Sequence, residues 1–212
     1  MTSDIVADQV GYPTGMERQQ KKPVLASVYQ LKITLRDILP PIWRRVRVPA
    51  GIRLSQLHEA FQIVMGWTDS HLHQFEKDGA LYGLPDDEFS DSDVFDDTLA
   101  ALDQLLKAEG DSLLYVYDFG DNWRHDVVLE EILPGEAAGR PVCIAGERKC
   151  PPEDVGGTPG YERFLEVIFD PAHEDHEHMV RWAGGRFQAE EFKLDAVNKY
   201  LARLRRPTRR RF

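Results

Sequence analysis

The sequence predicts an α+β protein with a mainly antiparallel sheet, with helices packed on the sheet and concentrated in the C-terminal third. Two observations predict this fold class. Segments with strand-like composition or alternation gather in the first two thirds of the 212 residues, and helical spacing of apolar residues dominates the last third. This segregation differs from the alternating strand–helix order of a doubly wound fold.

The expected strands are short runs rich in β-branched, aromatic and apolar residues. In the first run apolar and polar residues alternate, and Pro40 and Pro41 separate it from the second, because proline cannot donate to a β ladder. The turn residues Gly120, Asp121 and Asn122 divide two later runs into a hairpin. We expect strands at residues 28–35, 42–48, 71–77, 113–119, 123–132 and 141–148.

The expected helices are marked by apolar residues three or four positions apart. The clearest covers residues 54–65, where apolar residues stand at positions 54, 57, 61, 64 and 65 and Gly66 ends the pattern. A shorter helix at 99–106 ends before Gly110. The last third of the chain contains three more expected helices, at residues 161–168, 174–182 and 190–204.

The composition is typical of a soluble globular protein, with 42% hydrophobic and 29% charged residues. No apolar run approaches the ~20 residues that span a bilayer, and the N-terminus lacks a basic segment followed by an apolar one. Two cysteines, Cys143 and Cys150, fit a reducing compartment. We therefore expect a cytoplasmic protein without membrane contact, with a loosely held tail at 1–26, a single domain at 27–204 and a basic tail at 205–212.

Charge is distributed unevenly along the chain. The net charge of −10 argues against nucleic acid wrapped over the whole surface. Seven acids nevertheless fall within residues 86–97, and six arginines fall within the last ten residues. Basic clusters are candidates for contact with a DNA backbone, and their ordinary alternative is a solvated surface. The candidate nucleic-acid contacts are Arg44, Arg45, Arg205, Arg206, Arg209, Arg210 and Arg211.

Residues 115–125 carry the strongest functional signal. Three aromatic residues and two carboxylates surround a turn, and Trp, Arg and His follow it. On the return strand Trp123 and His125 share one face, because side chains alternate along a strand. An indole and an imidazole would then stand beside carboxylates, which suits a cationic ligand. The candidate ligand-binding pocket comprises Trp67, Tyr117, Asp118, Asp121, Trp123, His125, Glu153, Asp154 and Tyr161.

A divalent metal is the candidate cofactor. His71 and His73 are two residues apart on an expected strand, so that both imidazoles face the same way. With His125 they form a candidate metal set, which nearby acids would complete. The alternative is that each imidazole hydrogen-bonds to a carboxylate or a backbone carbonyl and only orders the strand. The candidate acids are Asp118, Asp121, Glu153 and Asp154.

Two further motifs have plain structural alternatives. Residues 173–178 contain three histidines, but not in the His-Glu-x-x-His spacing of a zinc protease, and a solvated helix start explains them. Residues 150–157 combine a Pro-Pro turn with glycines that can expose backbone amides to an anion. The same loop also fits a structural corner in which Tyr161 packs on the hairpin. Its spacing matches neither a Walker A loop nor a dinucleotide fingerprint.

An ordered set of motifs resembles the Ri-plasmid open-reading-frame-three family. The motifs are LPPIWRR at 39–45, LSQLH at 54–58, MGW at 65–67, SHLHQF at 70–75, YVYDFGDNWRH at 115–125, CPPEDVGG at 150–157, GY at 160–161 and VN at 197–198. They run through residues 27 to 204. Members of this family are often labelled TnpR-type or resolvase-like passengers of mobile elements, so the resemblance implies a plasmid or transposon setting.

The resolvase-like label is not matched by the residues that a serine recombinase needs. Such an enzyme requires a nucleophilic serine close to an arginine cluster near its N-terminus, together with a helix-turn-helix. The early serines, Ser3 and Ser27, lack that arginine-rich setting, and the C-terminal helices show no clear turn motif. The sequence indicates that the label reflects genetic neighbourhood.

Three functions stay open at this point. The leading hypothesis is a non-catalytic module that binds a protein, a peptide or a small molecule at the hairpin pocket. The alternative is a metal-dependent hydrolase or nuclease that uses His71, His73 and His125, with the metal activating water. The third is a DNA-binding accessory protein of recombination, which contacts DNA through the basic tail.

Overall fold

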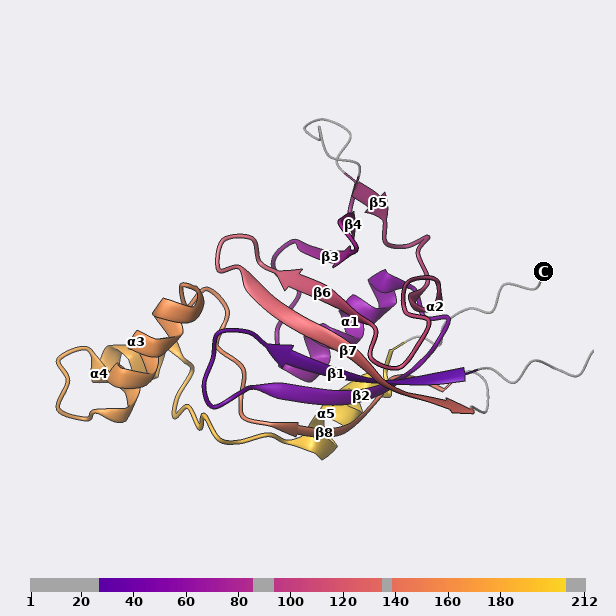
Figure 1. Cartoon of the computed structure of the whole chain (residues 1–212). Helices are drawn as coiled ribbons and strands as arrows, with labels where there is room; N and C mark the ends of the chain where they lie inside the picture. Colours follow the sequence, from indigo (N-terminus) through magenta and orange to yellow (C-terminus); the bar gives the residue numbers. More distant parts are fainter. Residues whose placement is uncertain (1–26, 86–93, 135–138, 205–212) are drawn as a thin grey trace, which may run out of the picture.

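The structure, a computed structural model, describes residues 27–85, 94–134 and 139–204. Its strands are β1 (Ser27–Leu35), β2 (Trp43–Pro49), β3 (His73–Lys77), β4 (Ala80–Gly83), β5 (Val94–Asp96), β6 (Ser112–Tyr117), β7 (Trp123–Pro134) and β8 (Val142–Glu147). They form one sheet in the order β5–β4–β3–β6–β7–β1–β2–β8 (Figure 1). All adjacent strands in it are antiparallel except β4 and β5, which are parallel. The predicted α+β class with a mainly antiparallel sheet is confirmed.

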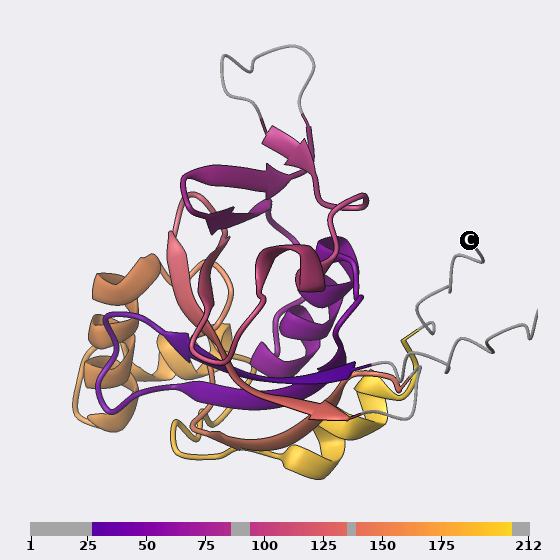
Figure 2. The same cartoon turned by 45° about the vertical axis from the view of Figure 1, so that its right-hand side comes forward.

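Five helices accompany the sheet in the described ranges. They are α1 (Leu54–Met65), α2 (Leu102–Leu105), α3 (Gly157–Phe169), α4 (His176–Trp182) and α5 (Leu194–Leu201). Helices α3, α4 and α5 lie in the last third of the chain, whereas α1 and α2 come earlier, where helices were expected at 54–65 and 99–106. α1 lies against the sheet, α5 lies beside β8, and α3 and α4 lie together at one end (Figures 1 and 2). No helix in these ranges is long and apolar enough to cross a membrane.

The β6–β7 hairpin forms as the residue pattern predicts. On β7 the side chains of Trp123, His125, Val127 and Leu129 are buried, and the residues between them are more exposed. The register places Tyr117 opposite Trp123. One face of the hairpin therefore belongs to the interior and the other to solvent, as expected for a sheet covered on one side.

Helix α1 covers that interior face and has the predicted bounds. Its apolar stripe includes Leu57, Phe61 and Val64, which are all buried. The ring of Phe61 packs edge-on against Tyr115, with 5.2 Å between centroids. Full burial of one such side chain contributes about 1.5–3 kcal/mol. Helix α1 therefore supplies apolar cover to the middle strands of the sheet.

The short strands β4 and β5 were not expected. Asp78 and Gly79 connect β3 to β4 with φ angles of 51° and 82°. A two-residue Asp-Gly turn is a strong hairpin signal, so the sequence contained the information for β4. β5 is an edge strand of the sheet and pairs with β4 in parallel. Local sequence patterns do not reveal such a pairing. The predicted tails at 1–26 and 205–212, and the acidic residues 86–93, lie outside the described residues.

Candidate functional site

The tip of the β6–β7 hairpin is built around Asp118. Its φ of 57° is left-handed, a conformation that aspartate tolerates better than most residues. Its Oδ1 accepts hydrogen bonds from the backbone N–H groups of Gly120, at 2.9 Å, and Asp121, at 3.2 Å. These bonds fix the buried Asp118 side chain and direct its other oxygen, Oδ2, toward His71.

A second loop, residues 150–157, is fixed against this tip. The backbone N–H of Gly156 donates to Oδ2 of Asp121 at 3.1 Å. Gly157 has a φ of 68°, and a Cβ there would lie 2.7 Å from the carbonyl oxygen of Asp121. Glycine is therefore required where the two loops touch. The contact holds Asp154 close to Asp118.

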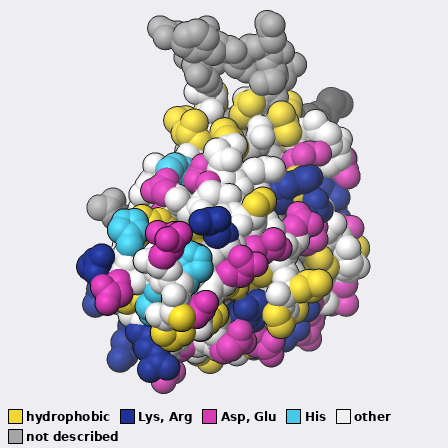
Figure 3. All heavy atoms as spheres, turned by 90° about the vertical axis from the view of Figure 1, so that its left-hand side faces the viewer, with side chains coloured by type: hydrophobic (Ala, Val, Ile, Leu, Met, Phe, Trp, Pro, Cys, Tyr) yellow, Lys and Arg dark blue, Asp and Glu magenta, His cyan; other side chains and the backbone are white. Residues whose placement is uncertain are grey.

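His71 lies between the two loops. Its Nε2 atom is 3.1 Å from Oδ1 of Asp154, 3.6 Å from Oδ2 of Asp118 and 4.0 Å from Oε2 of Glu153. This nitrogen is buried and has no hydrogen-bond partner among the described residues. The nearby oxygens therefore lie off the direction in which the ring nitrogen forms hydrogen bonds. On the face of the molecule shown in Figure 3, histidine and acidic side chains stand next to one another at the surface.

His71, Asp118 and Asp154 form a candidate metal site. Each offers one ligand atom, and the three atoms lie within 4.8 Å of one another. Ligands bound ~2.1 Å from a metal are about 3.0–3.5 Å apart at octahedral or tetrahedral angles. The two nitrogen–oxygen distances of 3.1 and 3.6 Å are close to that range. One imidazole and two carboxylates suit a divalent ion such as Zn²⁺ or Mn²⁺.

Glu153 positions the segment that carries His71. Its Oε1 accepts hydrogen bonds from the backbone N–H of Thr68, at 2.8 Å, and from the Thr68 hydroxyl, at 3.1 Å. The Tyr117 hydroxyl also donates to this carboxylate and accepts from the backbone N–H of Ser70. Burial raises the pKa of Tyr117, so its hydroxyl keeps the proton that it donates.

The aromatic residues of the predicted pocket lie beneath this site, inside the protein. The ring of Trp67 is 4.9 Å from that of Tyr117, 6.2 Å from that of Trp123 and 5.3 Å from that of His125, measured between centroids. The sequence grouped them correctly, but Trp123 is only 1% exposed. The reason is that their face of the hairpin is the one that packs on the core. They are buried in the core, whereas we expected them to line a ligand-binding pocket.

His125 is not part of the metal group. Its Nδ1 donates to the backbone carbonyl of Tyr115 at 3.2 Å, and the ring is fully buried beside Trp67. Burial lowers the pKa of His125 to about 4, so the imidazole is neutral near pH 7. The expected metal set of His71, His73 and His125 therefore does not form, because the side chain of His125 points from β7 into the core.

His73 also has partners other than His71. Strand β3 begins at His73, so His71 precedes the strand and the expected alternation does not pair the two imidazoles. The Nε2 of His73 hydrogen-bonds to Oδ2 of the buried Asp97 at 2.8 Å. The His73 ring stacks on His58, with 3.5 Å between centroids and 6° between planes.

Sequence reasoning missed His58 and Asp69. The Nε2 of His58 bonds to Asp69 and its Nδ1 to the Tyr115 hydroxyl, both at 2.7 Å. Burial lowers the pKa of His58 to about 4, and the neighbouring His73 acts in the same direction. The available signal was a histidine between Leu57 and Phe61 on a helix, since a buried polar group needs partners. A cavity of about 650 Å³ beside the stack is lined by Ser55, His58, Asp69, Ser70, His71, Leu72, His73, Leu84, Asp97 and Thr98.

Tyr161 belongs to a separate cluster. It is fully buried and packs against Phe164 and Phe187, with ring centroids 6.2 and 6.3 Å away. Burial raises its pKa to about 12. It supports the fold around α3 and lies in neither the metal group nor an open pocket, which corrects its predicted role.

The two predicted DNA contacts in the described residues differ sharply. Arg44 is 1% exposed, and its guanidinium donates to the backbone carbonyls of Val64, Glu147 and Arg148 at 2.7 to 2.8 Å. It is a structural residue and is not accessible to nucleic acid. Arg45 is partly exposed and pairs with Glu130 through bonds of 2.5 and 2.8 Å. The other candidates, Arg205, Arg206, Arg209, Arg210 and Arg211, lie outside the described residues.

Known proteins share both the sequence and the fold of this chain. The model of the family described as plasmid pRiA4b ORF-3-like protein matches residues 27–196. The uncharacterized protein y4hQ of Sinorhizobium fredii (strain NBRC 101917 / NGR234) is 42% identical over 161 residues, which span 76% of this chain and 83% of that protein. The crystal structure of a protein of unknown function, MM3350, from Methanosarcina mazei Go1 is similar with a TM-score of 0.73 and 42% identity, over 81% of this chain and 97% of that chain.

Proposed function

This chain belongs to the plasmid pRiA4b ORF-3-like family, and we propose that it binds one divalent cation through His71, Asp118 and Asp154. The observation that carries the proposal is the buried Nε2 of His71. Carboxylate oxygens surround it at 3.1 to 4.0 Å, yet it forms no hydrogen bond with any described residue. An imidazole that only neutralised these acids would donate an aligned hydrogen bond to one of them. Metal ligands instead all point toward a common centre.

The cation would serve as the contact point of a binding module. Three protein ligands leave coordination positions for water or for an oxygen donor of another molecule. The Asp154 side chain is 70% exposed, so these positions face solvent. A peptide, a partner protein or a small molecule with a carboxylate or carbonyl oxygen would bind there. The buried indoles of Trp67 and Trp123 would support this site from below.

A metal-dependent hydrolase is the second candidate. The observation that favours it is the cavity of about 650 Å³, because both His71 and the hydrogen-bonded pair of His73 and Asp97 line it. A divalent cation lowers the pKa of water, and an imidazole oriented by a carboxylate is a common proton acceptor. A nuclease or a DNA-binding accessory protein also needs phosphate contacts. Of the predicted arginines that the structure describes, only Arg45 is partly exposed.

Isothermal titration with Mn²⁺ and with Zn²⁺ tests the proposal. We expect one cation per chain, and affinity at least about 10-fold weaker in His71→Ala and in Asp154→Asn. His178→Ala is the matched control, because it removes an exposed imidazole from α4. Melting curves of all variants show whether each is folded. Binding that is unchanged in His71→Ala, or lost only in His178→Ala, would assign any cation to the surface histidines and reject the site.

A further inference from the structure

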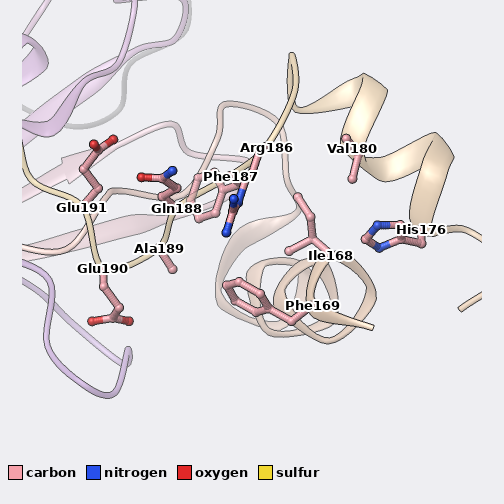
Figure 4. Close-up of a pocket in the computed structure, with 10 residues that line it drawn as sticks. All are labelled: Ile168, Phe169, His176, Val180, Arg186, Phe187, Gln188, Ala189, Glu190 and Glu191. Atoms are coloured by element: carbon pink, nitrogen blue, oxygen red, sulfur yellow. The ribbon is translucent and has the colours of Figure 1, made fainter. Parts of the chain in front are cut away.

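A second cavity of about 720 Å³ lies beside α3 and α4 (Figure 4). None of its lining residues belongs to the candidate metal site of His71, Asp118 and Asp154. Its apolar surface includes the buried side chains of Ile168, Phe187 and Ala189. Phe169 also lines it, and this ring is 59% exposed. The cavity therefore presents apolar surface to water at a size typical of small-molecule sites, which are about 300–1,000 Å³.

Of the charged residues that line this cavity, the acidic ones form ion pairs within the described part of the chain and the basic one does not. Oε1 of Glu190 pairs with Arg148 at 3.0 Å, and Oε2 of Glu191 pairs with Lys193 at 3.0 Å. Both carboxylates are thus compensated. Arg186 has neither a hydrogen bond nor an ion pair with any residue in the described ranges. In Figure 4 its guanidinium extends from the chain toward the apolar side chains. Among the lining residues, Arg186 therefore adds one uncompensated positive charge to an apolar surface.

His176 contributes a second polar group. Its Nδ1 donates to the backbone carbonyl of Val167 at 3.0 Å, which fixes the orientation of the ring. Figure 4 shows the imidazole and the Arg186 guanidinium on either side of Ile168. The His176 ring is thus held in place by α3, and Arg186 is the polar group left to orient a ligand that lies over Ile168.

We propose that this cavity binds a small amphipathic monocarboxylate. Its apolar part would cover Ile168, Phe169 and Phe187, and its carboxylate would pair with Arg186. A guanidinium and a carboxylate form two parallel charge-assisted hydrogen bonds, which fixes the orientation of the ligand as well as its charge. This site shares no residue with the proposed metal site, so either can fail without the other.

Calorimetric titration with decanoate, decan-1-ol and decylamine tests the proposal. The full chain is used with a chelator present, so that the carboxylate cannot bind a cation at His71. We expect decanoate to bind one per chain, and the neutral and cationic analogues to bind more weakly. Arg186→Gln should weaken decanoate binding about 10-fold or more. Arg181→Gln should leave it unchanged, because Arg181 pairs with Glu177 and does not line the cavity.

Phe169→Ala separates this cavity from other apolar surface. The Phe169 ring is largely exposed, so its loss should preserve the fold and should weaken the binding of decanoate and of decan-1-ol alike. The proposal is overturned if decanoate does not bind. It is also overturned if decan-1-ol binds as tightly as decanoate, or if decanoate affinity is unchanged in Arg186→Gln.

Discussion

The Nε2 atom of His71 lies 3.1 Å from Oδ1 of Asp154 without an aligned hydrogen bond between them. Three segments bring the surrounding ligand atoms together. The segment before β3 is held to the hairpin because His73 pairs with Tyr117 in the sheet. The loop before α3 is held by the bond from Gly156 to Asp121. A cation bound at His71, Asp118 and Asp154 would tie all three segments together, and should raise the free energy of unfolding by an amount that grows with the logarithm of its affinity.

The contact of Gly157 with the hairpin tip should be necessary for both stability and cation binding. Gly157→Ala places a Cβ 2.7 Å from the carbonyl oxygen of Asp121, whereas Gly79→Ala meets nothing within 4 Å. Both glycines have positive φ, so each variant carries about 1 kcal/mol of backbone strain. We expect Gly157→Ala to lose about 1–3 kcal/mol more than that, because the loops must separate. Urea denaturation measures the loss.

A cation titration of the same two variants gives the functional counterpart. Gly157→Ala should bind the cation more weakly, because the loop that carries Asp154 is displaced from Asp118. Gly79→Ala, in the turn between β3 and β4, should bind it normally. Equal stability and equal affinity in the two variants would show that the contact does not position the site.

Arg44 and Arg45 should differ strongly in their effect on stability. Arg44→Met leaves the buried carbonyls of Val64, Glu147 and Arg148 without their donor, which should cost about 3 kcal/mol or more. Arg45→Met removes a partly exposed ion pair with Glu130 and should cost about 1 kcal/mol or less. Chemical denaturation at pH 7 compares them. Similar losses would contradict the structural role that we assign to Arg44.

Stability should fall as the pH drops from 6.5 to about 4. Burial lowers the pKa of both His58 and His125 from 6.5 to about 4, so the unfolded chain takes up these protons before the folded one does. The contribution of these two histidines to the free energy of unfolding is therefore greatest above pH 6.5. It decreases at lower pH, by on the order of 3 kcal/mol for each histidine at pH 4. Denaturation curves at several pH values measure this slope.

His125→Leu is the variant that attributes the slope to its cause. It removes one of the two buried imidazoles, so the decrease in stability between pH 6.5 and 4 should be smaller than in the unmodified chain. An undiminished slope would mean that other groups, such as the carboxylates, produce the pH dependence.

Local patterns predicted most of the fold. The extended pattern of residues 123–132 predicted β7, and the spacing of Leu54, Leu57 and Phe61 predicted α1 with its observed bounds. The pairing of β5 with β4 could not be predicted, because a three-residue strand has no periodicity and its partner is fixed only in three dimensions. Strand β4, in contrast, could have been predicted from the sequence, because Asp78–Gly79 is a typical two-residue hairpin turn.

The candidate site was predictable in its residue types and not in its arrangement. Asp118, Asp154 and His71 all stand in segments that the sequence singles out. Alternation placed Trp123 and His125 on one face correctly, but it could not tell which face is covered by α1. The contacts of His73 with Asp97 and His58 could not be predicted either, because these residues come from distant segments of the chain. Tertiary packing decides these contacts.

The most direct test of the proposed cation site is nitrogen NMR of the histidine rings during a Zn²⁺ titration, with His71→Ala used to assign its signals. We predict that the Nε2 resonance of His71 shifts and that this shift is complete at one equivalent of Zn²⁺. The resonances of the buried His58 and His125 rings should stay unchanged. An unchanged His71 resonance, with shifts confined to His173, His176 and His178, would contradict a cation held by His71, Asp118 and Asp154.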